Sequence, residues 1–555
     1  MEKFKELRGK KYKFWLDKLA RQLIKKFPKE KVFHLNCGLS VRGPQHVGRM
    51  RGELCIPDCI KRILKEKYKR EAIHYITLYD MDGLKAKGAK NGFPNDPEKQ
   101  RKYTGVSLFN IPDPYGCHKN WFEHFWEDFG NYLNQFGFEV KIVRTSEFYK
   151  TEGAKKIVKW ILENREKVIE TVNRFRLKNP WPEDFIPINP ICNNCLSIND
   201  TKATSFDLKK WVVDYECKKC GNRGRTSLEN AKLQWRLEWV SLWKVLHIEF
   251  EPYGKDHAVA GGSRETCNIF STELLKYQPP LGEWNDWVSL KMHGKRLGEM
   301  TASGFIGITP KQWLEVAEPE VLRYLYISTK PHAPITIDMD RIFVYHDKFD
   351  RAERIYFGVE KTDERELHNI RRSFELAQVR EIPSKPLFQL KYDFAAQLVQ
   401  ILPEKNRVRK AIEILTKIGQ LKGRPKKSEI ARISKRLELS KNWVEKYAPE
   451  KYKFKIVEKI AKKEMKKLSE KQKKALINLG KFLEKTRTDK AIWDKIREIA
   501  DELHMKPEKI FEAAYLVLLG KNYGPRLVPL IQSLDKEFVV SRFKLKKIKI
   551  YRSSK

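Results

Sequence analysis

A short apolar strand, followed at once by a glycine- and proline-containing turn and then a helix, restricts the fold of this chain more than any other feature. The apolar run covers residues 32–39, the turn reads GLSVRGPQ, and a helical pattern continues through Ile60 and Leu64. Strand, turn and helix in this order open the α/β units that bind nucleotides.

The same alternation continues over residues 30–270. It predicts an α/β fold with a doubly wound parallel sheet that is interrupted by insertions. Further strands are predicted at 72–80, 138–144 and 247–253, and a helix at 153–176. From about residue 365 the strand signals fade and patterns such as KKALINLGKFLEKT predict an all-α carboxy-terminal part.

The charge of the chain is strongly one-sided, with 112 Lys and Arg residues against 72 Asp and Glu residues and a net charge of +40. Surfaces rich in both signs are common in proteins from hot environments, but they do not explain the imbalance. A polyanionic partner does, because phosphates that bind Lys and Arg release counterions. Charge alone does not distinguish RNA from DNA.

Targeting signals are missing from the sequence. It contains no run of about 18 apolar residues, which argues against a membrane-spanning helix. The start of the chain lacks the pattern of a secretory signal, so a cytoplasmic location is expected. Nine cysteines, an odd number, favour metal binding over a disulfide framework in that compartment.

Two CxxC pairs, separated by 21 residues, predict a structural metal site. Four thiolates suit tetrahedral zinc and leave no coordination position open for catalysis. The alternative is a set of unrelated core cysteines, which two such spacings so close together disfavour. The expected ligands are Cys192, Cys195, Cys217 and Cys220.

A second group of metal-binding residue types lies within 12 residues. Sulfur, imidazole and carboxylate are all zinc ligands, although a single His is more often an ordinary core or surface residue. The group consists of Asp113, Cys117, His118 and His124.

The turn after the first strand carries groups suited to phosphate. Gly38 and Gly43 permit close approach of a ligand, and His46-Val47-Gly48-Arg49 precedes the predicted helix. A helix start favours anions, and imidazole and guanidinium groups can donate hydrogen bonds to a phosphorus transition state. An ordinary turn is the alternative.

These motifs together resemble the class I lysyl-tRNA synthetases of archaeal type. HVGR after GLSVRG resembles the HIGH signature of class I aminoacyl-tRNA synthetases, and IPDPYGCH resembles a zinc loop of the lysyl family. The blocks at 232–263 and 313–331 and the segment FEAAYLVLLGKNYGPRLVPLIQSLDKEFV are similar to further parts of that family. The resemblance covers essentially the whole chain.

The resemblance implies a Rossmann-type catalytic core with a zinc-binding insertion and an all-α carboxy-terminal anticodon-binding domain. The expected boundaries are 1–330 for the catalytic domain, with the insertion at about 111–232, then 331–390 for a connecting region and 391–555 for the anticodon-binding domain. It further implies activation of lysine with ATP to lysyl-adenylate, followed by transfer to tRNA(Lys). Mg²⁺, two Zn²⁺ ions and a monomeric state are expected with it.

Site residues follow from the motif positions that match. His46 and Gly48 are expected to contact ATP, with Arg49 beside them, and Gly38 and Ser40 to shape the amino-acid pocket. A lysine ammonium needs a carboxylate or an aromatic face. The residues expected to line its pocket are Trp235, Glu238, Tyr253, Asp256 and His257, with a role as core aromatics the less favoured alternative for Trp235 and Tyr253.

The second signature of the family is altered in this chain. The family carries KMSKS or KMSSS, whose lysine neutralises the departing pyrophosphate, whereas here the stretch from Glu299 to Gly304 reads EMTASG and keeps only Ser303 of the serines. A carboxylate near a triphosphate is repulsive. Lys295, with its neighbours Lys291 and Arg296 upstream of the loop, is expected to replace the missing charge.

Three functions are therefore compared. The first is a working lysine–tRNA ligase, and the second is a diverged paralogue that binds tRNA, or transfers lysine elsewhere, without ordinary charging. The third is a DNA-binding zinc protein, which accounts for the charge and the metal but leaves GKDH and HVGR without a purpose.

Overall fold

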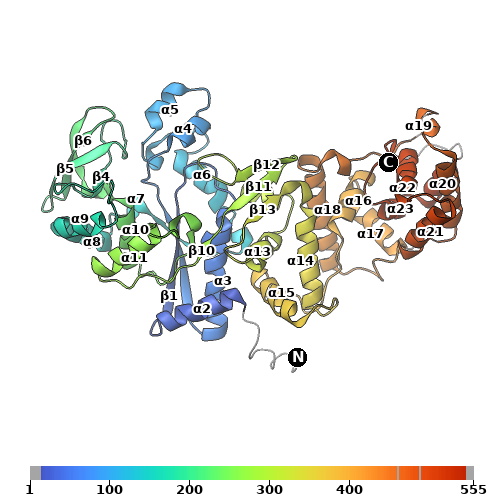
Figure 1. The fold of residues 1–555 in the computed structure, drawn as a ribbon, viewed down its shortest axis with the longest axis horizontal. Coiled ribbons are helices and arrows are strands. Elements are labelled where there is room, and N and C mark those ends of the chain that lie inside the picture. The colour runs from blue at the N-terminus through green and yellow to red at the C-terminus, as the bar shows by residue number, and fades with distance from the viewer. Residues whose placement is uncertain (1–13, 459, 461, 487–488, 546–555) are drawn as a thin grey trace.

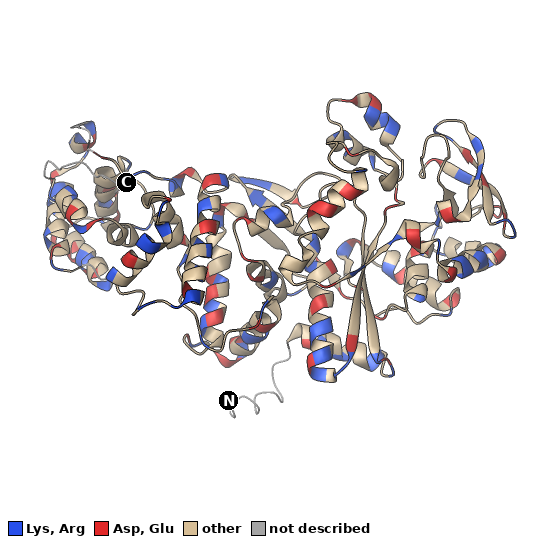
Figure 2. Cartoon of the chain, turned by 180° about the vertical axis from the view of Figure 1, so that it is seen from behind, with Lys and Arg blue, Asp and Glu red and all other residues tan. Residues whose placement is uncertain are grey.

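The computed structural model describes residues 14–458, 460, 462–486 and 489–545. The molecule is elongated, with the α/β part at one end and the helical part at the other (Figure 1). Lys and Arg positions occur along its whole length and are mixed with acidic positions (Figure 2). Within the described residues, no helix combines the length and the apolar character that crossing a membrane requires.

A parallel sheet forms the centre of the α/β part. Its three strands lie in the order β1 (Val32–Leu39), β2 (Glu71–Leu78) and β3 (Lys141–Arg144), and all run in one direction. The predicted strands at 32–39, 72–80 and 138–144 correspond to these three. β1 and β2 are mostly buried, as expected for strands that are covered on both sides, whereas the residues of β3 at the edge are exposed or half-buried.

The sheet continues on the other edge of β1. A parallel bridge joins Leu35 to Phe250, and a second joins Phe250 to Leu281. Beyond them β9 (Tyr253–Gly254) pairs with β10 (Trp284–Asn285), again in parallel. The chain therefore places β2 and β3 on one side of β1 and the later segments on the other, which creates a topological switch point beside β1. The predicted α/β fold with a doubly wound sheet is confirmed.

Two predicted elements are less regular than expected. The strand at 247–253 is reduced to the bridge at Phe250 and the two residues of β9, because His247 takes a left-handed conformation (φ 54°) before it. The helix at 153–176 is divided at Asn164, whose side chain donates a hydrogen bond to the Trp160 carbonyl (2.8 Å) and so ends the first part.

The insertion carries its own small sheets and packs on four helices through a shared core. β4 and β8 pair antiparallel, and so do β5, β6 and β7. The elements are β4 (Ile188–Pro190), β5 (Thr201–Asp207), β6 (Val212–Cys217), β7 (Arg223–Ser227), β8 (Ala231–Leu233), α8 (Glu152–Glu163), α9 (Arg165–Asn173), α10 (Trp235–Val245) and α11 (Ser263–Glu273).

A second sheet follows the insertion and leads into the altered signature loop. β11 (Val288–Met292) and β12 (Lys295–Glu299) form a hairpin, and β13 (Ile335–Asp338) runs parallel to β11. The other helices of this half are α2 (Trp15–Lys26), α3 (Ile56–Ile63), α4 (Ala86–Gly92), α5 (Pro97–Tyr103), α6 (Trp121–Gly130), α7 (Thr145–Phe148), α12 (Pro310–Leu314) and α13 (Pro319–Ser328).

After β13 the described residues are helical or irregular, which confirms the predicted all-α carboxy-terminal part. Two apolar cores lie within it, one around α16 to α18 and one around α20 to α24. The helices are α14 (Phe343–Tyr356), α15 (Glu364–Ala377), α16 (Tyr392–Ile401), α17 (Arg407–Lys417), α18 (Lys427–Lys446), α19 (Lys462–Lys466), α20 (Glu470–Leu483), α21 (Asp489–Glu502), α22 (Pro507–Leu519), α23 (Leu527–Ser533) and α24 (Lys536–Phe543). The predicted domain boundaries at 330 and 390 stay predictions.

Arg323 of α13 joins the central sheet region to the first helices of the helical part. Its guanidinium is fully buried and lies 2.6 Å from an Asp58 oxygen on α3. It also donates hydrogen bonds to the carbonyls of Phe136, Leu376 and Ala377 (2.9–3.1 Å). This one side chain thus connects three parts of the chain: α3, the turn that ends at Phe136, and the end of α15.

We predict that Arg323→Met lowers the free energy of unfolding by about 3–5 kcal/mol, because Asp58 and three carbonyls lose a buried partner. Denaturant unfolding measures this loss. Arg365→Met, at an exposed position of α15, is the control and is expected to change stability little. Equal stabilities of the two variants would contradict the role of Arg323.

Candidate active site

A cavity of about 550 Å³ opens at the switch point of the sheet. Its walls come from the turn after β1, the start of α10, the segment around β9 and the altered signature loop. Ligands of open α/β sheets bind at this position. Of the predicted site residues, those that line it are Gly38, Ser40, His46, Gly48, Arg49, Trp235, Tyr253, Asp256, His257 and Ser303.

His46 presents an imidazole with two free nitrogens. Its side chain is 6% exposed, and neither ring nitrogen has a hydrogen-bonding partner. Burial, and then the charge of Arg49, lower the pKa of His46 to about 3, so the ring is neutral at physiological pH. Helical turns begin at Met50, as predicted. A neutral donor therefore lies at the start of a helix and faces the cavity.

Two glycines allow the signature loops to pack together. A Cβ on Gly43 would lie 2.3 Å from the Ala302 carbonyl oxygen, and this residue also has φ +149°. A Cβ on Gly48 would lie 2.9 Å from His46 Nδ1 and 3.3 Å from the Met300 sulfur. Larger residues at either position would separate the two loops or displace the imidazole.

The altered loop forms a tight turn. Thr301 and Ile306 form an antiparallel bridge, and the Ile308 carbonyl accepts a hydrogen bond from the Val47 amide (2.9 Å). Asn91 of α4 donates its side-chain amide to the Ser303 carbonyl (3.0 Å). The loop is thus attached both to the first signature and to α4.

Aromatic rings form another part of the cavity wall. Trp235 stacks on Trp239 (centroids 5.1 Å apart), and both rings lie about 5.5 Å from the His257 ring. Arg264 lies over the Tyr253 ring, 4.9 Å from its centroid. Such a wall suits flat or cationic groups of a ligand.

Glu251 is a buried carboxylate at the base of this wall, and the sequence interpretation missed it. It is 2% exposed, lines the cavity, and accepts hydrogen bonds from Asn36 Nδ2 (3.1 Å) and from the Trp243 indole. Burial raises the pKa of Glu251, although the Arg264 charge acts against the rise. An acidic residue inside the apolar run HIEFEPY was the signal that could have identified it.

Glu238 does not line the cavity, although it was predicted to contact the substrate. Its carboxylate lies 2.8 Å from Lys232 Nζ and accepts a hydrogen bond from the Tyr149 hydroxyl (2.8 Å). The side chain is fully buried on α10. Glu238 is therefore occupied by an internal lysine, a partner that sequence spacing does not reveal.

Lys232 also binds Asp82, which in turn holds two residues of the cavity. Asp82 accepts from Lys232 Nζ (2.6 Å), Ser40 Oγ (2.8 Å) and Arg42 Nη2 (2.7 Å). Burial by itself raises the pKa of Asp82, but the charges of Lys232 and Arg42 outweigh it and hold the pKa below its usual value. Burial lowers the pKa of Lys232, and its two carboxylate partners more than reverse this.

Of the predicted cations, Arg49 lines the cavity, but those upstream of the altered loop do not. Lys295 and Arg296 lie on the exposed strand β12 and do not line it, and Lys291 Nζ pairs with Asp338 (2.9 Å). The cations that line the cavity are Arg42, Arg49 and Lys85. Lys85 follows the carboxyl end of β2, where ligand contacts are expected in such sheets, and that position was the available signal.

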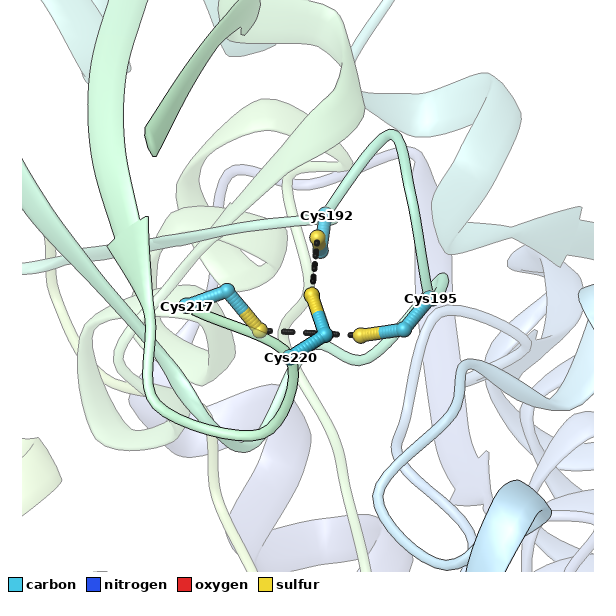
Figure 3. A group of neighbouring side chains, drawn as sticks. All are labelled: Cys192, Cys195, Cys217 and Cys220. Atoms are coloured by element: carbon cyan, nitrogen blue, oxygen red, sulfur yellow. Dashed lines mark hydrogen bonds between the residues drawn. The ribbon is translucent and has the colours of Figure 1, made fainter. Parts of the chain in front are cut away.

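The four cysteines of the CxxC pairs come together in the insertion, with their sulfurs converging (Figure 3). Cys195 Sγ lies 3.5 Å from Cys217 Sγ, and Cys192 Sγ lies 3.7 Å from Cys220 Sγ. A tetrahedron with metal–sulfur bonds of about 2.3 Å has edges of roughly 3.8 Å. The group could therefore hold a tetrahedral metal ion.

The second predicted group also assembles. Cys117 Sγ lies 3.1 Å from His118 Nδ1 and 3.2 Å from His124 Nδ1. The Asp113 carboxylate accepts three hydrogen bonds from the amides of residues 115, 117 and 118 and so fixes the loop. This group is the more exposed of the two.

Fold and cavity together define an enzyme with a Rossmann-type nucleotide-binding core. Residues 13–380 match the model of the family described as tRNA synthetases class I (K), and residues 393–546 match that of an anticodon binding domain. The chain belongs to the class I tRNA synthetases of this (K) family. That finding excludes the DNA-binding alternative and confirms the family predicted from the sequence.

Curated relatives cover nearly the whole chain. The lysine–tRNA ligase of Aeropyrum pernix is 34% identical, over 96% of this chain and 97% of that protein. The lysine–tRNA ligases of Methanosphaera stadtmanae and Methanocaldococcus jannaschii are 31% and 32% identical, each over 96% of this chain and 99% of theirs. A solved glutamate tRNA ligase from Elizabethkingia meningosepticum (12% identity, TM-score 0.35, 93% and 99% coverage) is too distant for any conclusion.

We predict that Lys232→Met destabilises the chain by about 3–5 kcal/mol, because the buried Glu238 then has no cation and Asp82 keeps only Arg42. Their pKa values would rise in the folded variant, so the deficit should shrink as the pH falls and the carboxylates take up protons. Denaturant unfolding at acid and at neutral pH measures both effects. A deficit that stays constant or grows towards acid pH would contradict this account.

Proposed function

We propose that this chain is a lysine–tRNA ligase that activates lysine with ATP and transfers it to tRNA(Lys). The observation that carries the proposal is the polarity of the cavity. One group of lining residues combines a neutral imidazole, which has free nitrogens, with the neighbouring cations Arg42, Arg49 and Lys85. A second group combines a buried carboxylate with aromatic rings. Such a cavity suits a triphosphate and an amino acid with a cationic side chain.

In the first step, a carboxylate oxygen of lysine attacks the α-phosphorus of ATP. The new P–O bond forms as the bond to the β-phosphate oxygen breaks, which yields lysyl-adenylate and pyrophosphate. His46 donates a hydrogen bond to the phosphate oxygens, and Gly48 keeps the space beside it open. Positioning and charge stabilisation supply most of the catalysis in reactions of this type.

Glu251 is the proposed partner of the lysine ammonium. Its carboxylate is held by Asn36 and Trp243, and the aromatic rings of Trp235 and Tyr253 line the approach to it. A buried, fixed carboxylate discriminates well, because a substrate without the ammonium would leave it unpaired. Asp256 and His257 are proposed to contact the amino-acid end of the ligand.

The second step transfers the lysyl group to the terminal ribose of tRNA(Lys). Single-stranded bases of the tRNA would bind elsewhere, in a cavity of about 800 Å³ between α20 and α22. This cavity offers lysines and a partly exposed ring, because Tyr523 is 47% exposed and Lys521 lies beside it. Single-stranded bases stack on such rings while lysines bind the backbone. This cavity lies within the part that matches the anticodon binding domain. The proposed ligase acts as a monomer in the cytoplasm.

Metal ions complete the proposal. Cys192, Cys195, Cys217 and Cys220 would hold one Zn²⁺ and stabilise the insertion, and Asp113, Cys117, His118 and His124 would hold a second. Mg²⁺ would accompany ATP and neutralise part of the triphosphate charge.

A diverged paralogue without ordinary charging is the second candidate function. The observation in its favour is Glu299, which lines the cavity in a stretch, 299–304, that contains no cation. Lysine-dependent exchange of pyrophosphate into ATP separates the ligase from a paralogue that only binds tRNA. Aminoacylation of tRNA(Lys) separates it from a paralogue that transfers lysine elsewhere. Tight tRNA binding without that exchange would favour the paralogue.

We predict that Glu251→Gln raises KM for lysine tenfold to a hundredfold, since a charged hydrogen bond is worth about 1.5–3 kcal/mol. The KM for ATP should change little. Lysine-dependent pyrophosphate exchange measures both constants. Glu163→Gln, on the surface of α8, is the matched control. A similar KM for lysine in both variants would remove Glu251 from the substrate pocket.

The raised pKa of Glu251 also predicts a pH dependence. Lysine binding requires the ionised carboxylate, so KM for lysine should rise as the pH falls through this raised pKa. The Gln variant lacks the titrating group and should lose that dependence. A pH profile of KM for lysine in both proteins measures the difference, and identical profiles would speak against the assignment.

We predict that the purified chain carries zinc at both groups. Cys220→Ser should lose one ion and lower the melting temperature, because structural zinc stabilises the folded state. Cys117→Ser should lose only the other ion. Metal analysis by mass spectrometry counts the ions, and Cys267→Ser, a buried cysteine outside both groups, is the control. Unchanged zinc content in Cys220→Ser would refute the first site.

A further inference from the structure

We propose that Lys85, supported by Lys87, supplies the positive charge that the stretch 299–304 lacks, and binds the β- and γ-phosphates of ATP and the departing pyrophosphate. This inference rests on the proposed function and deepens it. The residues that contact the phosphates would then lie in the segment that leads into α4 and not in the signature loop.

Lys85 is the cation of the cavity with its charge uncommitted. Arg42 pairs with Asp82 (2.7 Å) and Arg49 with Glu53 (3.1 Å), whereas no described carboxylate lies within 4.0 Å of the Lys85 ammonium. The like charge of Arg42, followed by burial, lowers the pKa of Lys85, and the charge of Asp82 acts against this without forming an ion pair. A cation that lies near like charges and has no ion-pair partner gains most from an anionic ligand.

Lys87 lies against the altered loop itself. A Cβ built on Gly304 would lie 3.1 Å from Lys87 Nζ and 3.3 Å from its Cε. The ammonium therefore occupies the space beside the loop that a side chain at position 304 would take. Asn91 of the same helix holds the Ser303 carbonyl (3.0 Å), so α4 and the loop are joined at two points.

Glu299 also lines the cavity. Its charge acts on Lys255, whose ammonium pairs with Asp286 (2.6 Å), and Glu299 is not among the charges that act on Lys85. Like charges repel, which favours a triphosphate placed towards Lys85 rather than towards Glu299. The acid at position 299 thus disfavours phosphate beside the loop, while Lys85 and Lys87 attract it towards the start of α4.

Lysine-dependent pyrophosphate exchange and calorimetric binding of inorganic pyrophosphate test the inference. We expect Lys85→Ala to raise KM for ATP and to weaken pyrophosphate binding tenfold or more, without a change in KM for lysine or in melting temperature. Lys85→Arg should retain most of both functions. Lys87→Ala should act in the same direction but less strongly, because Lys87 does not line the cavity.

Two further variants sharpen the test. Lys90→Ala, an exposed lysine of the same helix, is the control and should behave like the unmodified protein. Glu299→Lys restores a cation to the loop and should recover much of the loss in Lys85→Ala. If Lys85 had only a structural role, a lysine at position 299 would not restore the activity lost in Lys85→Ala.

The outcomes separate this inference from the proposed function. If Lys85→Ala matches Lys90→Ala in both assays, the inference is wrong, whatever the activity of the unmodified chain. If the unmodified chain shows no lysine-dependent exchange, the proposed ligase function is wrong. Pyrophosphate binding that still depends on Lys85 in that case would support the phosphate site on its own.

Discussion

The arrangement of the active site depends on Lys232, a buried lysine between Asp82 and Glu238. It joins the segment after β2 to the start of α10, and through Asp82 it fixes Ser40 and Arg42 at the cavity. Taking three charges out of water is costly, and close hydrogen bonds offset part of that cost, although burial still leaves the pKa of Glu238 raised. These contacts hold residues that lie far apart in the sequence in one defined arrangement.

The lining of the cavity contains two groups of opposite character. Burial keeps His46 neutral in one group and raises the pKa of Glu251 in the other. Arg42 and Arg49 act through their charges on Lys85, while the indoles of Trp239 and Trp243 donate hydrogen bonds to Glu251. In the proposed function the first group binds the triphosphate and the second binds lysine, so the wall of the cavity would orient lysyl-adenylate.

Local sequence patterns predicted the structure correctly wherever the spacing between nearby residues determines their geometry. The apolar run at 32–39 became β1, both CxxC pairs converged, and His46 and Gly48 reached the cavity. In each case the residues are close in sequence, or lie on a strand whose carboxyl end must meet its neighbours. The family resemblance, confirmed by the comparisons, extended these patterns to the whole chain.

Charge partners that meet only in the folded chain were not predictable in this way. Glu238 binds Lys232 in place of substrate, Lys295 lies on an exposed hairpin, and Glu251 and Lys85 were found only in the structure. The sequence by itself determined the order of elements, the metal-binding groups and the signature turn, because periodicity and short spacing encode them. Only the tertiary structure decided which ionised groups face one another and which face the cavity, since pairing depends on contacts that no local pattern contains.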